Sequence, residues 1–310
     1  MLVQGDVNMI KSTIFFASAD KIHKLSGVLY EPDQEPKGIF HVVHGMNEHK
    51  GRYDDFLREM CGSGYICIAY DNLGHGETVR DKSERGFFAS KDGYKLLAED
   101  VYSVSRQMKQ KYPGLPYYLM GHSMGSFIVR LAACIHPEIP DKLIVMGTAG
   151  PNPVLNPSLC LINIIKAIYG EKHISMFLEK LAFGKFNEHF TETGGDWLAK
   201  DPEVRRLLDS DEMCDFHFTI SAFYDLIKMN SVVNSKQWFY SINKKMPILL
   251  ISGKDDPVGD YGKGVFAVFK KLKVSGADVQ LKLYRDNRHE LLDDTARDKV
   301  ISDIMSFLSA

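Results

Sequence analysis

Residues 115–125 read LPYYLMGHSMG, an apolar run that ends in the pattern Gly-x-Ser-x-Gly. The apolar run predicts a strand, and residues 126–135 behind it predict a helix. A serine between a strand and a helix is typical of a sharp turn that exposes its hydroxyl to a base. Such a turn crowds the positions two before and two after the serine, which Gly121 and Gly125 occupy. We interpret Ser123 as a nucleophile, with a tight turn that carries no chemistry as the alternative.

A nucleophilic serine needs a base that takes its proton and an acid that orients the base. In folds with this kind of turn, the acid and then a histidine follow later in the chain. Residues 247–252 predict a late strand, and the loop behind it carries Asp255 and Asp256. We favour Asp256 because Pro257 fixes the turn directly after it, and we keep Asp255 as the alternative.

The candidate base is His289, the only histidine that follows the last predicted strand, residues 279–284. Its neighbour Glu290 is expected to order the loop or to begin the final helix, which is predicted over residues 293–309. His75 also follows a strand, but it precedes the serine in the chain. We therefore interpret it as a structural histidine of its loop.

The negative charge that forms during attack on a carbonyl needs two backbone N–H donors, an oxyanion hole. One donor is expected from Met124, directly after the serine, and the other from Met46, in the loop after a strand predicted over residues 38–43. Gly45 lets the backbone come close at this point. The spacing of three nearby histidines matches no strong metal motif, so we expect no metal and a structural role for His41, His44 and His49.

Strands and helices alternate along most of the chain, which predicts an α/β fold with a mostly parallel sheet and helices on both faces. Two early strands, residues 12–17 and 24–30, are expected to pair antiparallel. The alternation stops over residues 151–240, where prolines precede helical segments rich in large apolar residues. These residues fit both a core of their own and the inner wall of a cap. We predict a cap over this interval, inserted into a core made of residues 1–150 and 241–310.

Composition narrows the class of protein. Of the 310 residues, 45% are hydrophobic and 25% are charged, as in ordinary globular proteins. A net charge of −2 without long runs of one sign argues against nucleic acid as a partner. The five cysteines include no Cys-x-x-Cys pair and fit a reducing compartment.

Residues 1–11 lack the apolar centre of a secretory signal, and the apolar stretch over residues 159–169 is too short to cross a bilayer. We therefore expect a cytoplasmic protein. Transient contact with a membrane or micelle surface through the cap is a further hypothesis.

Five stretches together carry a resemblance to a known superfamily: residues 44–53 (HGMNEHKGRY), 71–76 (DNLGHG), 121–125 (GHSMG), 253–258 (GKDDPV) and 289–290 (HE). The chain resembles the α/β-hydrolases, specifically their monoacylglycerol lipase and lysophospholipase branch, which is serine aminopeptidase-like. The stretches span most of the predicted core, and their combination is specific.

The resemblance implies an α/β-hydrolase fold, with a mostly parallel eight-stranded sheet flanked by helices and a helical cap inserted after the sixth strand. It implies ester hydrolysis without a cofactor, a catalytic triad of Ser123, Asp256 and His289, and an oxyanion hole of the Met46 and Met124 N–H groups. The chain departs from the pattern in two places. Asn47 stands where relatives commonly have a small residue, and residues 287–288 (Asn-Arg) stand where relatives often have a glycine-containing turn.

The leading functional hypothesis is a serine carboxylester hydrolase that acts on lipid-like esters with medium or long acyl chains. Alternatives on the same triad are a small-ester esterase and a peptidase or amidase, for which Glu188 and Glu192 are candidate acids to hold a free amine. A non-catalytic binding protein is the least favoured hypothesis because all three triad residues are present. Relatives with dehalogenase or epoxide-hydrolase chemistry carry an aspartate in place of Ser123.

Overall fold

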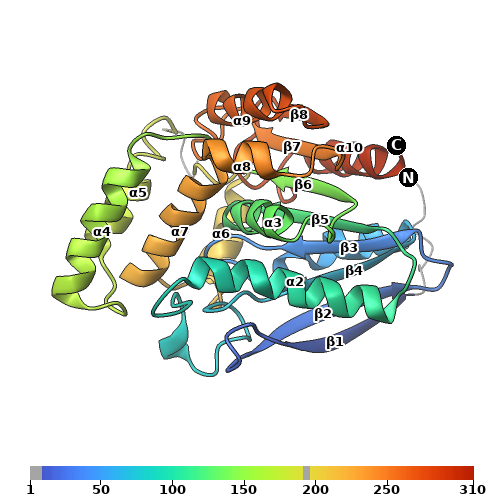
Figure 1. The fold of residues 1–310 in the computed structure, drawn as a ribbon, viewed down its shortest axis with the longest axis horizontal. Coiled ribbons are helices and arrows are strands. Elements are labelled where there is room, and N and C mark those ends of the chain that lie inside the picture. Colours follow the sequence, from blue (N-terminus) through green and yellow to red (C-terminus); the bar gives the residue numbers. More distant parts are fainter. Residues whose placement is uncertain (1–8, 191–195) are drawn as a thin grey trace.

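An eight-stranded sheet forms the middle layer of the computed structural model, which describes residues 9–190 and 196–310 (Figure 1). Its strand order is β1-β2-β4-β3-β5-β6-β7-β8. The strands are β1 (Met9–Ala17), β2 (Lys24–Pro32), β3 (Gly38–Val43), β4 (Tyr65–Tyr70), β5 (Tyr117–His122), β6 (Lys142–Met146), β7 (Ile248–Gly253) and β8 (Val279–Tyr284).

Strand pairing confirms the predicted mostly parallel sheet. The strands β4, β3, β5, β6, β7 and β8 pair in parallel, whereas β1 pairs antiparallel with β2 and β2 with β4. Every residue of β3, β4, β5 and β7 is buried, which explains their nearly continuous apolar sequences. The carboxyl ends of these parallel strands lie at one edge of the sheet, where the loops with the candidate site residues begin.

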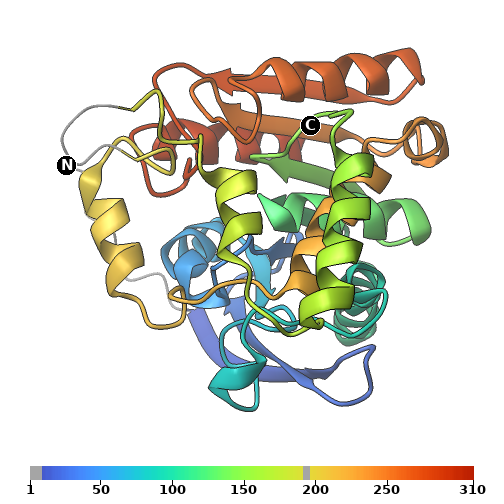
Figure 2. The same ribbon diagram turned by 90° about the vertical axis from the view of Figure 1, so that its left-hand side faces the viewer.

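Helices cover both faces of the sheet (Figures 1 and 2). They are α1 (Asp54–Gly62), α2 (Gly93–Lys111), α3 (Met124–Ile135), α4 (Leu155–Tyr169), α5 (Met176–Phe183), α6 (Pro202–Ser210), α7 (Ile220–Val233), α8 (Lys236–Ser241), α9 (Lys263–Val274) and α10 (Arg297–Ser309), with short 3-10 helices η1 (Lys50–Tyr53) and η2 (Lys82–Glu84).

Two hydrophobic cores result, one on each face of the sheet. Consecutive strand residues such as Ile39 and Phe40 point into different cores, as the two-residue period of a strand requires. One core contains side chains of α2, α3, α7, α8 and α9, and the other contains side chains of α1 and α10.

The final helix begins later than predicted, at Arg297 rather than at residue 293. The intervening residues hold loops instead. The Asp294 carboxylate accepts the Lys200 N–H at 2.6 Å, and the Asn287 side-chain oxygen accepts the Ala296 N–H at 3.0 Å. Glu290 therefore does not begin this helix.

Helices α4 to α8 lie between β6 and β7, and α4, α5 and α6 cover the carboxyl edge of the sheet (Figures 1 and 2). We call residues 151–240 the cap; its boundaries as a domain stay a prediction. Among the described residues, no helix has the length and apolar character needed to cross a membrane. Two sequence interpretations fall wholly or partly outside the described residues: that of residues 1–11, of which residues 1–8 are not described, and that of Glu192.

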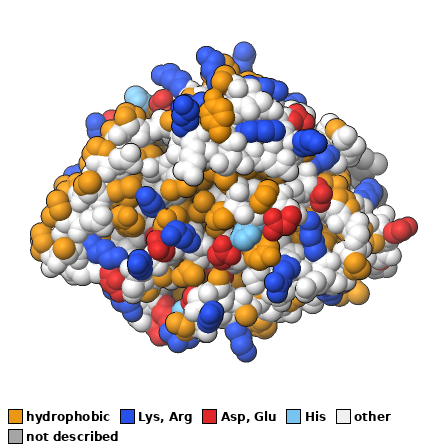
Figure 3. Space-filling view, viewed as in Figure 1, with side chains coloured by type: hydrophobic (Ala, Val, Ile, Leu, Met, Phe, Trp, Pro, Cys, Tyr) orange, Lys and Arg blue, Asp and Glu red, His pale blue; other side chains and the backbone are white. Residues whose placement is uncertain are grey.

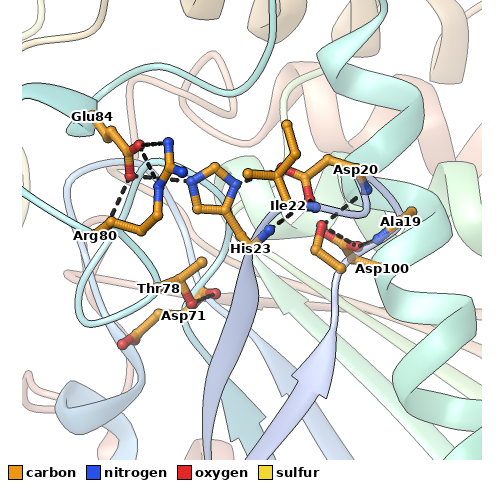
Figure 4. A network of polar contacts seen from close by, with 10 residues as sticks. Ala19, Asp20, Ile22, His23, Asp71, Thr78, Arg80, Glu84 and Asp100 are labelled. Carbon is orange, nitrogen blue, oxygen red and sulfur yellow. Dashed lines mark hydrogen bonds and ion pairs between the residues drawn. The ribbon is translucent and has the colours of Figure 1, made fainter.

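The turn between β1 and β2 is tied to the rest of the core by a polar network (Figure 4). His23 contacts Asp20 beside it, and its Nε2 lies 3.1 Å from a carboxylate oxygen of Glu84. Asp100 of α2 accepts the Ala19 N–H at 2.6 Å. Burial raises the pKa of Asp100 to about 7, more than its hydrogen bonds lower it.

Candidate active site

Ser123 lies on a strained turn between β5 and α3. Its φ is +51°, a left-handed conformation that is costly for a residue with a side chain. The flanking glycines are required by space: a Cβ on Gly121 would lie 2.2 Å from the Gly125 carbonyl oxygen, and one on Gly125 would lie 2.1 Å from the Val43 carbonyl oxygen. The turn therefore has the crowding and the strain of a nucleophile elbow.

The loops after β7 and β8 bring Asp256 and His289 together. His289 Nδ1 lies 2.9 Å from an Asp256 carboxylate oxygen, and both side chains are buried. The other Asp256 oxygen accepts the Val258 N–H at 2.8 Å. Asp255 takes no part in this contact; its backbone N–H donates to the Asn287 carbonyl. The structure thus places the Asp256 carboxylate, and not that of Asp255, against His289, and the role of Asp256 as the catalytic acid stays a prediction.

His289 has a second ring nitrogen, Nε2, that is not used in the contact with Asp256. With Nδ1–H donated to Asp256, Nε2 carries a lone pair that can accept a proton. Nε2 is buried and has no hydrogen-bond partner among the described residues, and both His289 and Ser123 line the same cavity. Gly147 leaves room for the imidazole, because a Cβ there would lie 3.0 Å from His289 Cε1.

The loop after β3 brings Met46 beside the elbow. A Cβ on Gly45 would lie 2.9 Å from Ser123 Cβ, so glycine permits this close approach. Within the described part of the chain, no group accepts the backbone N–H of Met46 or of Met124, the first residue of α3. Both N–H groups are therefore available to a ligand atom at Ser123, as an oxyanion hole requires.

A buried charged cluster behind the elbow was not recognised from the sequence. His122 Nδ1 lies 3.0 Å from Glu48, and the Tyr53 hydroxyl donates to Glu48 at 2.7 Å. Burial alone would lower the pKa of His122, but the charges of Glu290 and Glu48 outweigh it and raise this pKa to about 9. Arg52 in turn pairs with Glu290 at 3.3 Å. A charged His122 thus supports the backbone of the loop after β8 that carries His289, which we call the base loop. The Nε2 atom of His122 lies 3.3 Å from the His289 carbonyl oxygen.

Among the described residues, two groups of side chains have the composition of metal ligands, but each is satisfied within the protein. One is the cluster of Glu48, His122 and Glu290 just described. In the other, His49 lies beside Asp211 and Cys214, with Nε2 2.7 Å from Asp211. His49 Nδ1 accepts the Gly51 N–H, so the ring proton is on Nε2 and is donated to Asp211, which leaves no lone pair for an ion.

His75 lies away from His289 and Asp256, in a buried aromatic cluster. Its ring contacts His44, Phe88, Phe216 and Phe218. Burial lowers its pKa to about 3, so the ring is neutral. This environment fits the predicted structural role.

A cavity of about 1060 Å³ opens above Ser123. This volume is at the upper end of the range for small-molecule sites. Its walls combine core residues with helices α4, α5, α6 and α7 of the cap, and the apolar part is formed by Leu155, Leu161, Ile162, Leu178, Leu181, Phe183, Phe223, Leu226 and Ile227. Glu188, a candidate for holding an amine, is exposed and does not line this cavity.

The sheet order, the strained serine turn and the His289–Asp256 contact define an α/β-hydrolase. Comparison with known proteins agrees. The structure of a thermostable carboxyl esterase from Bacillus coagulans, in complex with glycerol, superposes with a TM-score of 0.91 at 31% identity and covers 97% of this chain and 99% of that one. The fold class and the resemblance to α/β-hydrolases are thereby confirmed.

Residues 34–296 match the model of the serine aminopeptidase (S33) family, and the chain belongs to this family of hydrolases. The chain is 27% identical to human monoglyceride lipase over 266 residues, and this alignment covers 84% of this chain and 78% of that protein. It is 24% identical over 286 residues to the monoacylglycerol lipase of Mycolicibacterium smegmatis, covering 90% of this chain and 91% of that protein.

Proposed function

We propose that this protein is a serine carboxylester hydrolase that cleaves lipid-like acyl esters. The observation that carries the proposal is one cavity that holds a serine on a strained turn, an imidazole oriented by a buried carboxylate, and a wall of apolar side chains. The relatives named above, which are lipases and an esterase, support the same reaction.

The reaction proceeds in two halves. The Ser123 hydroxyl attacks the ester carbonyl while His289 Nε2 takes its proton, and the Met46 and Met124 N–H groups stabilise the negative oxygen. The intermediate collapses, the alcohol leaves with the proton from His289, and the acyl group stays on Ser123. Water activated by His289 then releases the carboxylic acid. Asp256 holds the imidazole and stabilises its charged form in both halves.

The substrate we propose has one long acyl chain and a small polar alcohol, as in a monoacylglycerol or a lysophospholipid. The apolar wall from α4, α5 and α7 gives the chain a place to lie. Polar residues of the same cavity, among them Glu179 and Asp215, can face the alcohol.

The test is hydrolysis of p-nitrophenyl esters from acetyl to palmitoyl, together with 1-monoacylglycerol and lysophosphatidylcholine. We expect kcat/KM to rise toward longer chains and to vanish in Ser123→Ala. Activity restricted to acetyl and butyryl esters would contradict the lipid-like substrate, and hydrolysis that persists in the variant would contradict the nucleophile.

We also propose that the cap docks transiently on lipid or micelle surfaces. Large apolar side chains of α4 and α5 are exposed, and Figure 3 shows hydrophobic side chains gathered at this end of the molecule. The side chains of this apolar cap surface are 56% to 68% exposed and belong to Ile164, Ile168, Tyr169, Met176, Phe177 and Leu181. Contiguous apolar surface of this kind marks membrane contacts more often than ordinary surface does.

Flotation with phosphatidylcholine liposomes tests the docking. We expect the protein to float with the vesicles and the Ile164→Asp, Ile168→Asp double variant to stay in the dense fraction. Leu207→Asp is the control, since Leu207 is 54% exposed on α6, outside the apolar cap surface. Absence of wild-type binding would contradict the proposal. The predicted cytoplasmic location stays a prediction.

A further inference from the structure

One segment of the cap joins the two loops that carry the proposed catalytic groups. Residues 196–216, which we call the clasp, consist of a loop, α6 and a second loop (Figure 2, yellow). Val204 is the only buried side chain of α6. The position of the clasp is therefore set by its two ends, and each end contacts a different loop.

The first end of the clasp is held by the base loop. Arg288 donates from Nη1 to the Asp196 carbonyl at 2.7 Å and to the Ala199 carbonyl at 3.0 Å. The backbone N–H of Glu290 donates to the Leu198 carbonyl at 2.7 Å. These donors stand directly before and after His289, so the base lies between two attachments to the cap.

The second end of the clasp is held by the loop after β3 that carries Met46, which we call the oxyanion loop. Asn47 donates from its side-chain amide to the Phe216 carbonyl and, at 3.3 Å, to the Cys214 carbonyl. His49 adds a contact to Asp211 at 2.7 Å. Asn47 follows Met46 directly and has a φ of +55°, a conformation that asparagine tolerates better than most residues.

We propose that Asn47 and Arg288 are positioning residues, which fix the oxyanion donor Met46 and the base His289 relative to the cap through the clasp. The inference rests on the proposed function and deepens it. Neither side chain takes part in bond making. Each holds the loop whose neighbouring residue does, so a shift of the clasp is transmitted to the oxyanion hole and to the base together.

The size of the expected effect follows from the sensitivity of catalysis to position. A misplacement of about 1 Å can cost about a hundred-fold in rate, and complete loss of an oxyanion donor costs about a hundred- to a thousand-fold. Loosening a donor without removing it should therefore lower kcat by about ten- to a hundred-fold.

The test uses Asn47→Gly and Asn47→Asp in the full chain, assayed on the best p-nitrophenyl ester. Glycine accepts the positive φ, so this variant removes the side chain with its amide without straining the backbone. Aspartate keeps the shape but turns an acceptor toward two carbonyl oxygens, and its loss should be larger. We expect kcat to fall in both, with KM within about two-fold of wild type.

If Asn47 and Arg288 only stabilised the fold, their substitution would reduce the number of correctly folded, active molecules. The kcat of each active molecule would then stay unchanged. Active sites are therefore counted by complete reaction with a fluorophosphonate, and kcat is expressed per labelled site. Arg288→Met should lower this kcat, and Arg288→Lys should restore part of it. The control is Arg206→Ala, because Arg206 pairs with Glu203 on its own helix.

Unchanged kcat per labelled site in Asn47→Gly, or a loss that appears only in the number of labelled sites, would overturn the inference. An equal loss in Arg206→Ala would overturn it as well. A wild-type protein without esterase activity would instead contradict the proposed function.

Discussion

Helices α3 and α4 are both rich in apolar residues, yet they have opposite environments. In α3, ten of twelve residues are buried, from Met124 through Ala133. In α4, only Leu155, Leu159 and Ile162 of fifteen are buried. The first helix packs on the sheet and begins at the proposed nucleophile; the second forms a wall of the cavity and turns the rest of its apolar surface outward.

The difference shows that apolar composition does not by itself indicate a stabilising core. A side chain stabilises the fold in proportion to the apolar area that it removes from water, and the outward face of α4 removes little. We therefore expect chemistry and stability to depend on α3 and the loops of the core, and contact with lipid to depend on α4. The following changes probe that division.

The largest effect is expected at the amino end of α3. Ser123→Ala removes the attacking oxygen and should lower kcat about a million-fold, as in other serine hydrolases. The measurement is ester hydrolysis by the wild type and the variant at equal protein concentration. The midpoint of thermal unfolding should not fall, because alanine meets the same backbone strain at this φ and differs from serine only by the hydroxyl oxygen. Residual activity near the wild-type level would mean that the chemistry lies elsewhere.

The next largest effect separates two neighbouring aspartates. Asp256→Asn should lower kcat about ten-thousand-fold because the amide favours the wrong tautomer of His289. Asp255→Asn, a substitution of the same kind one position earlier, should change kcat less than about three-fold, since the Asp255 side chain does not contact His289. Equal losses in the two variants would contradict the assignment.

A substitution in α3 should lower the free energy of unfolding more than a similar substitution in α4. Ile128→Ala in α3 removes a fully buried side chain and should lower the free energy of unfolding by about 3 kcal/mol. Ile168→Ala in α4 removes a side chain that is 68% exposed and should change it by less than about 0.5 kcal/mol. Urea denaturation measures both. Similar losses would show that α4 belongs to the stabilising core.

The smallest effect concerns the contact between α7 of the cap and α2 of the core. Asp225 of α7 lies against Gly93 and Tyr94 at the beginning of α2, and burial raises its pKa to about 7. A raised pKa means that the folded state binds the proton more tightly. This contribution to stability is therefore present at low pH and is lost as the pH rises through about 7.

We expect the wild type to lose about 2 kcal/mol more stability than Asp225→Asn between pH 5 and pH 8. Urea denaturation across this pH range is the measurement. Parallel pH profiles for the two proteins would contradict the shifted pKa.

Most of the sheet could be predicted from the sequence because buried parallel strands leave uninterrupted apolar runs. The bounds of β3 and β8 agree with the prediction residue for residue. The strand β5 begins two residues later than the apolar run, after Pro116, whose carbonyl accepts the Ile39 N–H. The elbow was recognisable because glycine spacing around Ser123 is a local signal.

The charged support of the site could not be predicted in this way. Glu48 and His122 are 74 positions apart in the sequence, and Arg288 reaches a carbonyl 92 positions away. Periodicity records only which face of an element is buried, so it does not reveal which distant polar group satisfies a buried charge. The two departures from the family pattern, Asn47 and Arg288, were the available signal, and both turn out to contact the cap.

The arrangement of β6 and β7 in the sheet determines how the cap could be replaced. The cap leaves the sheet after Met146 and returns at Ile248, and these strands are hydrogen-bonded partners. Because these strands are parallel, the chain leaves at the carboxyl end of β6 and must cross back to the amino end of β7. The last part of this crossing, α7 and α8, contributes side chains to the core on one face of the sheet. A different cap could therefore replace the earlier helices only if α7 and α8 were kept. A transplant that keeps the rate of the chemistry would have to bring carbonyl acceptors for Asn47 and Arg288.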